Sequence, residues 1–127
     1  MIVVDPSAIV AVLMGEPEAP RVKAALEAAH TRMISAASVV ELGIVVESRT
    51  GGRTPVERVL QRFELSIEPL DQAQSMTAME AWRRFGKGNH PAQLNLGDCY
   101  SYALAAVRGV PLLFVGSDFT QTDIIAA

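Results

Sequence analysis

The sequence predicts an α/β fold: a mostly parallel sheet with helices on both faces, in three layers. Two observations predict it. Short runs of β-branched and aliphatic residues alternate along the chain with longer segments of helical character. Strands separated by helices need crossover connections, which favour parallel pairing with a helical layer on each face. Because 127 residues suit one core and no repeat or linker interrupts them, we expect a single domain over 1–127.

The first half of the chain predicts two strands, each followed by helix. Ile2–Val4 is a β-branched run, and the proline at position 6 suits the first turn of a helix that begins directly after it. Met33-Ile34 predicts a second strand, from which Ser35–Ser38 leads into a largely buried helix. The helices expected in this half are Ala8–Met14, Glu18–His30 and Val39–Glu47.

The second half continues the alternation. Ser66–Pro69 predicts a third strand, and Pro111–Gly116 is the clearest strand pattern in the chain. Asp71 is expected to cap a long helix, and Gly109 to end the last one. The helices expected here are Val56–Phe63, Asp71–Phe85 and Asn95–Arg108, with a basic, glycine-containing loop at Gly86–Pro91.

Composition excludes several classes of protein. A net charge of −3 and a pI of about 5.3 argue against coating nucleic acid by bulk charge, so any nucleic-acid contact must be local. The single cysteine, Cys99, permits neither an internal disulfide nor a zinc cluster and suggests a reducing, cytoplasmic compartment. No signal peptide or apolar stretch of membrane-spanning length is evident, so no membrane association is expected.

Four acidic residues stand at the entrances to predicted elements. They are Asp5, Glu41, Asp98 and Asp118, with Asp123 as a candidate fifth. Asp5 and Asp118 each follow a strand, and sites in parallel sheets form beyond the carboxyl ends of strands. Converging carboxylates repel one another unless a cation compensates them, and an all-oxygen pocket suits Mg²⁺ or Mn²⁺.

Metal-bound carboxylates at a sheet edge are typical of nucleases, because the ion polarises a phosphoryl oxygen and activates water. No side-chain nucleophile is then needed. The sequence offers no plausible triad, since its only histidines are His30 and His90 and Cys99 has no evident base.

The same acids also have a purely structural explanation. Asp5 can cap the helix at Pro6, Ser38–Glu41 has the pattern of a capping box, and Asp98 is the third residue after a candidate Asn95 cap. Acidic residues are favoured at helix N-termini in general. Spacing alone therefore leaves the function of these acids undecided.

Four blocks in order along the whole chain resemble the acidic blocks of VapC-type PIN domains. They are Val3–Ala8, Ala37–Leu42, Leu96–Ala103 and Pro111–Phe119, the last followed by Thr122–Ile124. The resemblance implies a PIN-like α/β/α fold and a Mg²⁺-dependent endoribonuclease, with Mn²⁺ as a substitute ion. Asp5 and Asp98 would be the direct metal ligands, and Glu41 and Asp118 would complete the catalytic pocket.

The resemblance extends to supporting residues and partners. Ser7 would support Asp5 or a metal-bound water, and Asp123 would support the pocket. Pro6 departs from the Thr or Ser common at its position, but it keeps Asp5 extended and should preserve the site. The implied biology is the toxin of a type II toxin–antitoxin system: a homodimer that cleaves RNA and is covered by a VapB-like antitoxin whose Arg or Lys reaches the acids.

Two other functions would also use acidic residues at these positions. A catalytically weak PIN domain that serves as an antitoxin-binding and autoregulatory module would carry the same acids. A phosphoacceptor signalling domain also gathers aspartates at a sheet edge, but it predicts a lysine after the last long strand, and no lysine follows Lys87.

Basic residues cluster just before the Asp98 helix and are candidates for RNA-backbone contact. Arg83 and Arg84 also suit the C-terminal end of their own helix, where the helix dipole is negative. Trp82 and Phe85 lie at helical spacing from Ala78 and Met79, so core or dimer packing is expected for them. The candidate RNA-binding residues are Arg83, Arg84, Lys87 and His90.

Overall fold

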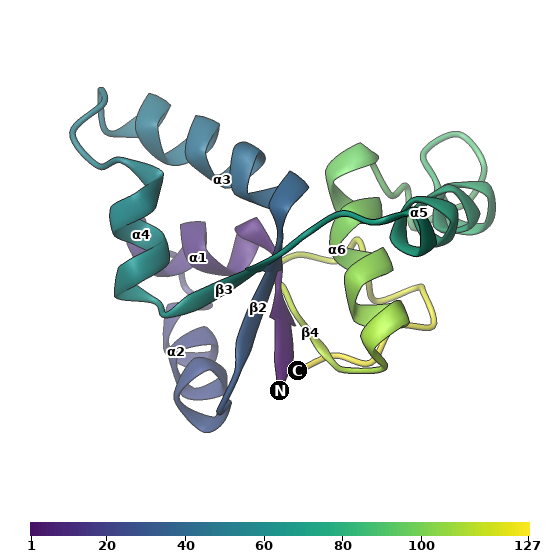
Figure 1. The fold of residues 1–127 in the computed structure, drawn as a ribbon, viewed down its shortest axis with the longest axis horizontal. Helices are drawn as coiled ribbons and strands as arrows, with labels where there is room; N and C mark the ends of the chain where they lie inside the picture. Colours follow the sequence, from purple (N-terminus) through teal and green to yellow (C-terminus); the bar gives the residue numbers. More distant parts are fainter.

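The computed structural model describes all 127 residues, as four strands and six helices (Figure 1). No helix is long and apolar enough to cross a membrane. The elements in chain order are β1 (Ile2–Val4), α1 (Pro6–Leu13), α2 (Ala19–Ala28), β2 (Arg32–Ser35), α3 (Ala36–Arg49), α4 (Val56–Arg62), β3 (Leu65–Glu68), α5 (Gln72–Phe85), α6 (Leu96–Arg108) and β4 (Leu112–Leu113).

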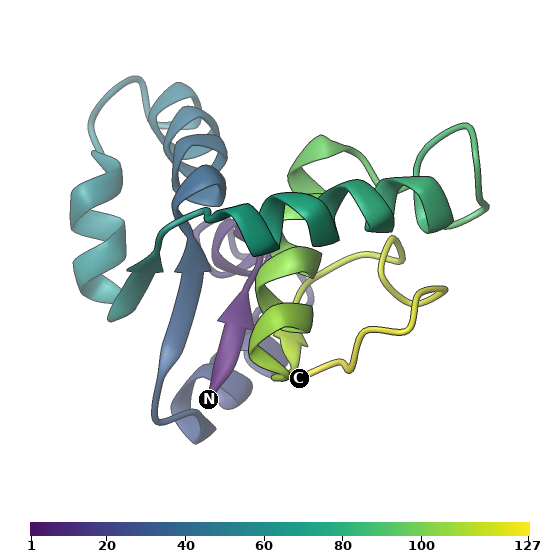
Figure 2. The same ribbon diagram turned by 45° about the vertical axis from the view of Figure 1, so that its right-hand side comes forward.

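The four strands form one parallel sheet in the order β3-β2-β1-β4. Helices α1 to α4 lie on one side of this sheet, and α5 and α6 lie on the other (Figures 1 and 2). The predicted α/β fold with a parallel sheet between helical layers is confirmed: β1, β2 and β3 are each followed by helices that cover the sheet before the chain enters the next parallel strand.

Each face of the sheet has its own core, and successive strand residues contribute to opposite faces. In β1, Val4 packs with α1, α2, α3 and α4, whereas its neighbour Val3 packs with α5 and α6. Met33 and Ile34 divide in the same way. This alternation explains why the strands are almost continuously apolar: both of their faces are buried.

The expected capping box at Ser38–Glu41 is wrong. Helix α3 begins at Ala36, and Ser35 is its cap, with the Ser35 hydroxyl accepting a hydrogen bond from the Ala37 amide at 3.3 Å. Ser38 is therefore inside the helix and fully buried. Because β2 runs directly into α3, the segment Ser35–Ser38 contains the cap and the first turn of the helix and is not a loop before it. Glu41 therefore has no capping role.

The predicted strand at Pro111–Gly116 is shorter than expected, since only Leu112 and Leu113 pair with β1. Beyond them the backbone bonds to side chains instead. The Phe114 carbonyl accepts from Arg21, and the Val115 amide donates to the Ser7 hydroxyl at 3.0 Å. β1 ends at Val4, so these groups have no strand beside them to continue the ladder.

Candidate active site

The candidate site lies beyond the carboxyl ends of the central strands. In Figure 1, the carboxyl end of β1 lies between the start of α3 and the start of α6. Asp5 directly follows β1 and its amide donates to the Leu113 carbonyl of β4 at 2.9 Å. Glu41 comes from α3 and Asp98 from the first turn of α6. The fold thus brings three distant acidic blocks to one edge, as predicted.

Asp5 is the most deeply buried of these acids, with 4% of its surface exposed. It caps α1, since one of its carboxylate oxygens accepts from the Ser7 amide at 3.0 Å. The other oxygen accepts from the Ser101 hydroxyl at 2.6 Å. Burial raises the pKa of Asp5, the hydrogen bonds from Ser101 and Ser7 oppose that rise, and the nearby Asp118 charge adds to it.

Asp98 is buried and serves as part of a capping box at the start of α6. The Asn95 side chain accepts from the Asp98 amide at 2.9 Å, and the Asp98 carboxylate accepts from the Asn95 amide at 3.0 Å. Burial raises its pKa to about 7; the Asn95 amide opposes this rise, and the charges of Asp5, Asp118 and Glu41 increase it. The capping explanation of this acid is therefore confirmed, and the same side chain also lies among the other acids.

Glu41 and Asp118 complete the group from more exposed positions. Partial loss of hydration raises the pKa of Glu41, and the Asp5 charge raises it further. Asp118 acts on both Asp5 and Asp98 through its charge. The structure therefore brings Asp5, Glu41 and Asp118 close enough to Asp98 for the charge of each to act on it, at one edge of the sheet.

Two serines hold Asp5 in place, and only one of them was predicted. The Ser7 hydroxyl accepts from the Val115 amide, which ties the start of α1 to the segment after β4. Ser101 was missed. It lies one helical turn after Asp98, is 1% exposed, and is a polar residue among Ala and Leu on the buried face of α6. That lone polar position on an apolar face was the available signal.

Asp123 does not join the acidic group. Its carboxylate accepts a hydrogen bond from the Tyr102 hydroxyl and forms an ion pair with Arg84 at 3.4 Å. None of the raised pKa values of Asp5, Glu41 and Asp98 has the Asp123 charge among its causes. Its position instead ties the C-terminal segment to α5 and α6.

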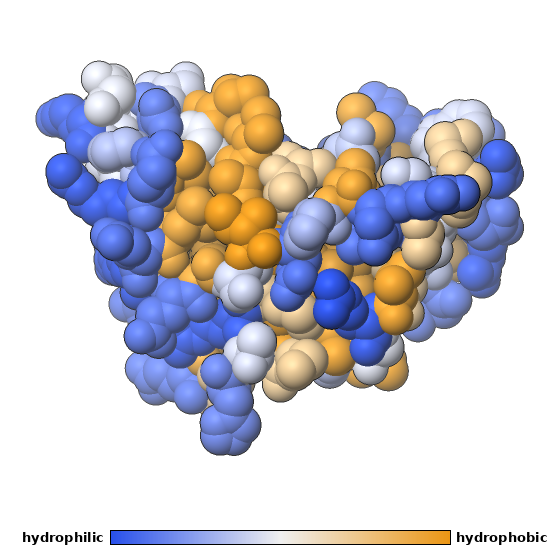
Figure 3. Space-filling model, viewed as in Figure 1, coloured by the Kyte–Doolittle hydropathy of each residue, from blue (hydrophilic) through white to orange (hydrophobic).

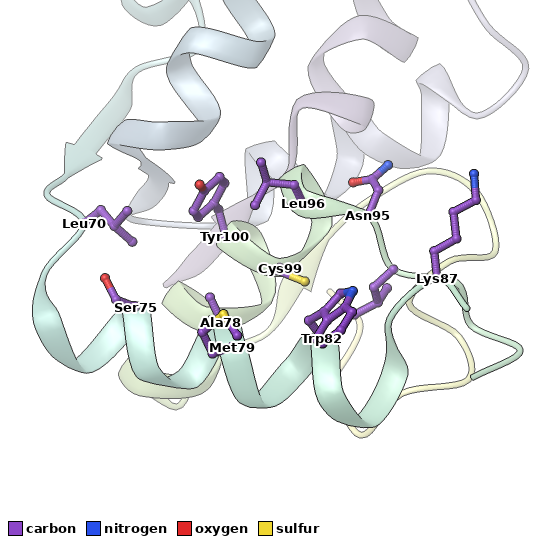
Figure 4. A pocket seen from close by; sticks show the side chains of 11 residues that line it. Leu70, Ser75, Ala78, Met79, Trp82, Lys87, Asn95, Leu96, Cys99 and Tyr100 are labelled. Carbon is purple, nitrogen blue, oxygen red and sulfur yellow. The ribbon is translucent and has the colours of Figure 1, made fainter. Parts of the chain in front are cut away.

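The four candidate RNA-binding residues differ in whether their side chains already have partners within the protein. Arg83 pairs with Glu80 on its own helix, and Arg84 pairs with Asp123 while lying over the Phe85 ring. The His90 ring accepts from the Ala92 amide and packs edge-on against Phe85. Lys87 is exposed, forms no ion pair, and lies near Asn95 at the start of α6 (Figure 4).

Beside the acids lies an apolar groove of about 560 Å³ between α5 and α6 (Figure 4). A second groove, of about 320 Å³, runs from there to α3 and reaches Glu41. Phe85 is core, as predicted, but Trp82 is 43% exposed and lines the first groove. We define the apolar strip by six residues of the two grooves on α3, α5 and α6: the exposed Val40, Ile44, Met79, Trp82 and Leu96, and the half-buried Tyr100.

The donor set suits a hard divalent cation. It consists of carboxylate oxygens only, and none of the chain's ion pairs neutralises any of the four acids. The side chains as they lie do not form a ready-made ligand shell, because no three acids, histidines or cysteines are placed to hold one ion together. In Asp5 and in Asp98, at least one carboxylate oxygen already accepts a hydrogen bond from within the protein.

Comparison with known proteins decides the family. The PIN-domain family model matches residues 2–125. VapC ribonuclease Mb0640 of Mycobacterium bovis is 46% identical over 124 residues, covering 96% of this chain and 95% of its own. The chain belongs to the VapC family of PIN domains. Another VapC ribonuclease, from Mycolicibacterium smegmatis, is 45% identical and covers 98% of both chains.

Solved VapC-like structures confirm the fold. Mycobacterium tuberculosis VapC20, a toxin that cleaves the sarcin-ricin loop, superposes with a TM-score of 0.79 at 19% identity, over 100% of this chain and 98% of its own. A toxin–antitoxin complex from Klebsiella pneumoniae gives a TM-score of 0.74 at 18% identity, over 100% and 97%. At these identities the likeness establishes the PIN architecture.

Proposed function

We propose that this VapC-family chain is a Mg²⁺-dependent endoribonuclease and the toxin of a toxin–antitoxin pair. The observation that carries the proposal is the meeting of Asp5, Glu41, Asp98 and Asp118 beyond the sheet edge, with raised pKa values in the first three and no cation of the chain to neutralise them. Relatives that are 45–46% identical over nearly the whole chain are ribonucleases, which supports RNA as the substrate.

Each acid has a distinct part in this proposal. Asp5 and Asp98 hold the ion, with Mn²⁺ able to replace Mg²⁺, and Glu41 and Asp118 complete the negative field around it. Bound there, the cation supplies Lewis acidity toward a phosphodiester oxygen and activation of water. Hydrogen bonds from Ser101 and Ser7 orient the Asp5 carboxylate, and one from Asn95 orients Asp98, which would support both acids as ligands of the ion.

Exposed cations near the site would bind the substrate backbone. Lys87 is the best placed of the four candidates because it is free of ion pairs and lies near the Asp98 helix start. Arg83, Arg84 and His90 already have partners within the protein, so RNA contact by them requires exchange of those partners.

The antitoxin is proposed to act on the same pocket. A partner segment that offers an arginine or lysine would neutralise the four acids and exclude the metal. Solved relatives of this fold include a toxin–antitoxin complex. A VapB-like partner should therefore lower metal-dependent cleavage when it is added in excess. We also propose that the protein works in the cytoplasm, where a single buried thiol stays reduced.

The decisive experiment is cleavage of total RNA by the purified protein with Mg²⁺, Mn²⁺ or EDTA. Asp5→Asn and Asp98→Asn keep the shape of the side chain and remove a charged ligand. We expect each to lower the rate at least about 100-fold, since loss of a ligand should cost no less than loss of a group that orients one. Asp71→Asn is the matched control, because asparagine also caps a helix and Asp71 caps α5 away from the site.

Cut sites that persist in EDTA or in both variants would contradict a metal-dependent mechanism. Absence of cleavage under all metal conditions by folded protein that still binds its antitoxin would favour the alternative of a catalytically weak, antitoxin-binding module. Sequencing of the cleaved RNA ends then defines the target.

A further inference from the structure

Gly97 lies in the first turn of α6, between the Asn95 cap and Asp98. Glycine is an unfavourable residue inside a helix, because it loses more conformational freedom on folding than alanine does. The backbone gives no reason for it: Gly97 is not among the residues with positive φ, so any L-residue could adopt its conformation. The reason must be steric.

The steric obstacle is a single side chain. A Cβ at position 97 would overlap the Oε1 atom of Glu41 and lie 3.0 Å from its Cδ. The next nearest atom, Oδ1 of Asn95, is at 3.4 Å, which is ordinary contact. The Glu41 carboxylate thus lies directly on the backbone of the turn that carries Asp98, in space that alanine would take.

No other glycine of the chain has this relation to an acid. Gly15, Gly51, Gly52, Gly88, Gly109 and Gly116 have positive φ and open space around them. A Cβ at Gly86 would overlap Trp82, and a Cβ at Gly43 of α3 would contact Val56 at the start of α4. Glu41 is therefore the side chain that a methyl group at position 97 would displace.

We propose that Gly97 is a positioning residue whose missing side chain sets where the Glu41 carboxylate lies relative to Asp98. The inference rests on the proposed function, in which Glu41 belongs to the cation pocket. A methyl group at 97 would push the carboxylate off the α6 turn, toward solvent or toward Val40 and Ile44 on its own helix. Helix α6 itself would become more stable, since alanine has a higher helix propensity than glycine.

The test is Mn²⁺ binding measured by isothermal titration calorimetry, with urea unfolding in EDTA as the separate measure of folding. The proteins are wild type, Gly97→Ala, Glu41→Ala and the double variant. We expect Gly97→Ala to weaken Mn²⁺ binding about tenfold, as loss of ligand support typically does, while its urea midpoint stays level or rises. Once Glu41 is absent there is nothing to displace, so the double variant should bind like Glu41→Ala alone. Gly43→Ala, a similar change in a nearby helix that meets only Val56, should bind like wild type.

Two outcomes would overturn the inference while leaving the proposed function intact. One is wild-type affinity in Gly97→Ala together with weakened binding in Glu41→Ala. The other is a further loss in the double variant, which would mean that Gly97 acts through something other than Glu41. If Asp98→Asn also binds Mn²⁺ as tightly as wild type, the proposed metal function itself fails, and the inference fails with it.

Discussion

At the scale of single residues, two acids of the candidate site combine a capping hydrogen bond with a raised pKa. Asp5 caps α1 and Asp98 closes the capping box of α6, and both also carry raised pKa values that reflect burial and mutual repulsion. A helix cap needs a carboxylate oxygen as acceptor, and a cation site needs the same oxygen as ligand. Since a carboxylate oxygen has two lone pairs, the capping bonds would leave one of them for the proposed cation and would fix the orientation of the acids.

The raised pKa of Asp98 predicts that the metal-free protein loses stability as pH rises. Its pKa is 3.8 for an ordinary side chain and about 7 in the folded protein. Between these values the folded state binds more protons than the unfolded state, so the free energy of unfolding falls with increasing pH. Asp5 and Glu41, also raised, act in the same direction. Urea unfolding in EDTA from pH 5 to pH 8 measures the slope.

Asp98→Asn should flatten that slope, and Mn²⁺ should reverse the loss at pH 8, because a cation stabilises the ionised form. A midpoint that is constant or rises over this range, or a slope unchanged in Asp98→Asn, would refute the assignment of the raised pKa to this residue.

At the scale of elements, the first turn of α6 concentrates the determinants of the site. It contains the Asn95 cap, the Gly97 backbone against Glu41, and Asp98. Ser101 follows on the buried face of the same helix and donates to Asp5. The start of α6 is therefore a capped helix terminus that contains Asp98 and lies against Glu41, while Ser101 further along the helix holds Asp5.

Removal of the cap should affect stability and activity differently in two helices. Asn95→Ala should lower the free energy of unfolding by about 1 kcal/mol and fray the turn that holds Asp98. Asp71→Ala should cost a similar amount, about 1 kcal/mol, by uncapping α5. We expect RNA cleavage to fall several-fold more in Asn95→Ala than in Asp71→Ala, with Asn95→Ser close to wild type in both measurements. Equal losses of cleavage in the two alanine variants would contradict a specific role of the α6 turn.

At the scale of the whole molecule, one face is unusually apolar. Hydrophobic side chains gather in the middle of the face in Figure 3, with hydrophilic ones on both sides. The apolar strip crosses α3, α6 and α5 and borders the acidic site. Within it, Leu96 is 70% exposed, Ile44 67% and Val40 62%. Exposed apolar area of this extent is typical of an interface.

We propose that the expected homodimer forms through this strip, with a second copy of the chain covering it. Ile44→Glu should place a charge in the interface and shift the protein to a monomer, as measured by light scattering over a range of concentrations. Ile125→Glu is the matched control, because Ile125 is equally exposed at 67% but lies outside the strip, in the C-terminal segment beside α6. A wild-type protein that is monomeric at all concentrations would exclude the homodimer and leave the strip to the antitoxin.

The sequence by itself determined the fold class, the order of nearly all elements and the four acids. Patterning is local: β-branched runs between helical segments, caps such as Asp71, and stop signals such as Gly109 are read from neighbours along the chain. The parallel sheet then places Asp5 and Asp118 at one edge, because the carboxyl ends of parallel strands meet there.

Only the tertiary structure decided the details that depend on contacts between distant residues. Ser101 reaches Asp5 across 96 positions, and Asp123 turns to Arg84 and Tyr102 rather than to the acids. The last strand stops after two residues because its neighbour β1 ends, although its own sequence would continue. Local pattern carries no information about which helix faces lie against one another, and that packing is what brings Glu41 onto Gly97.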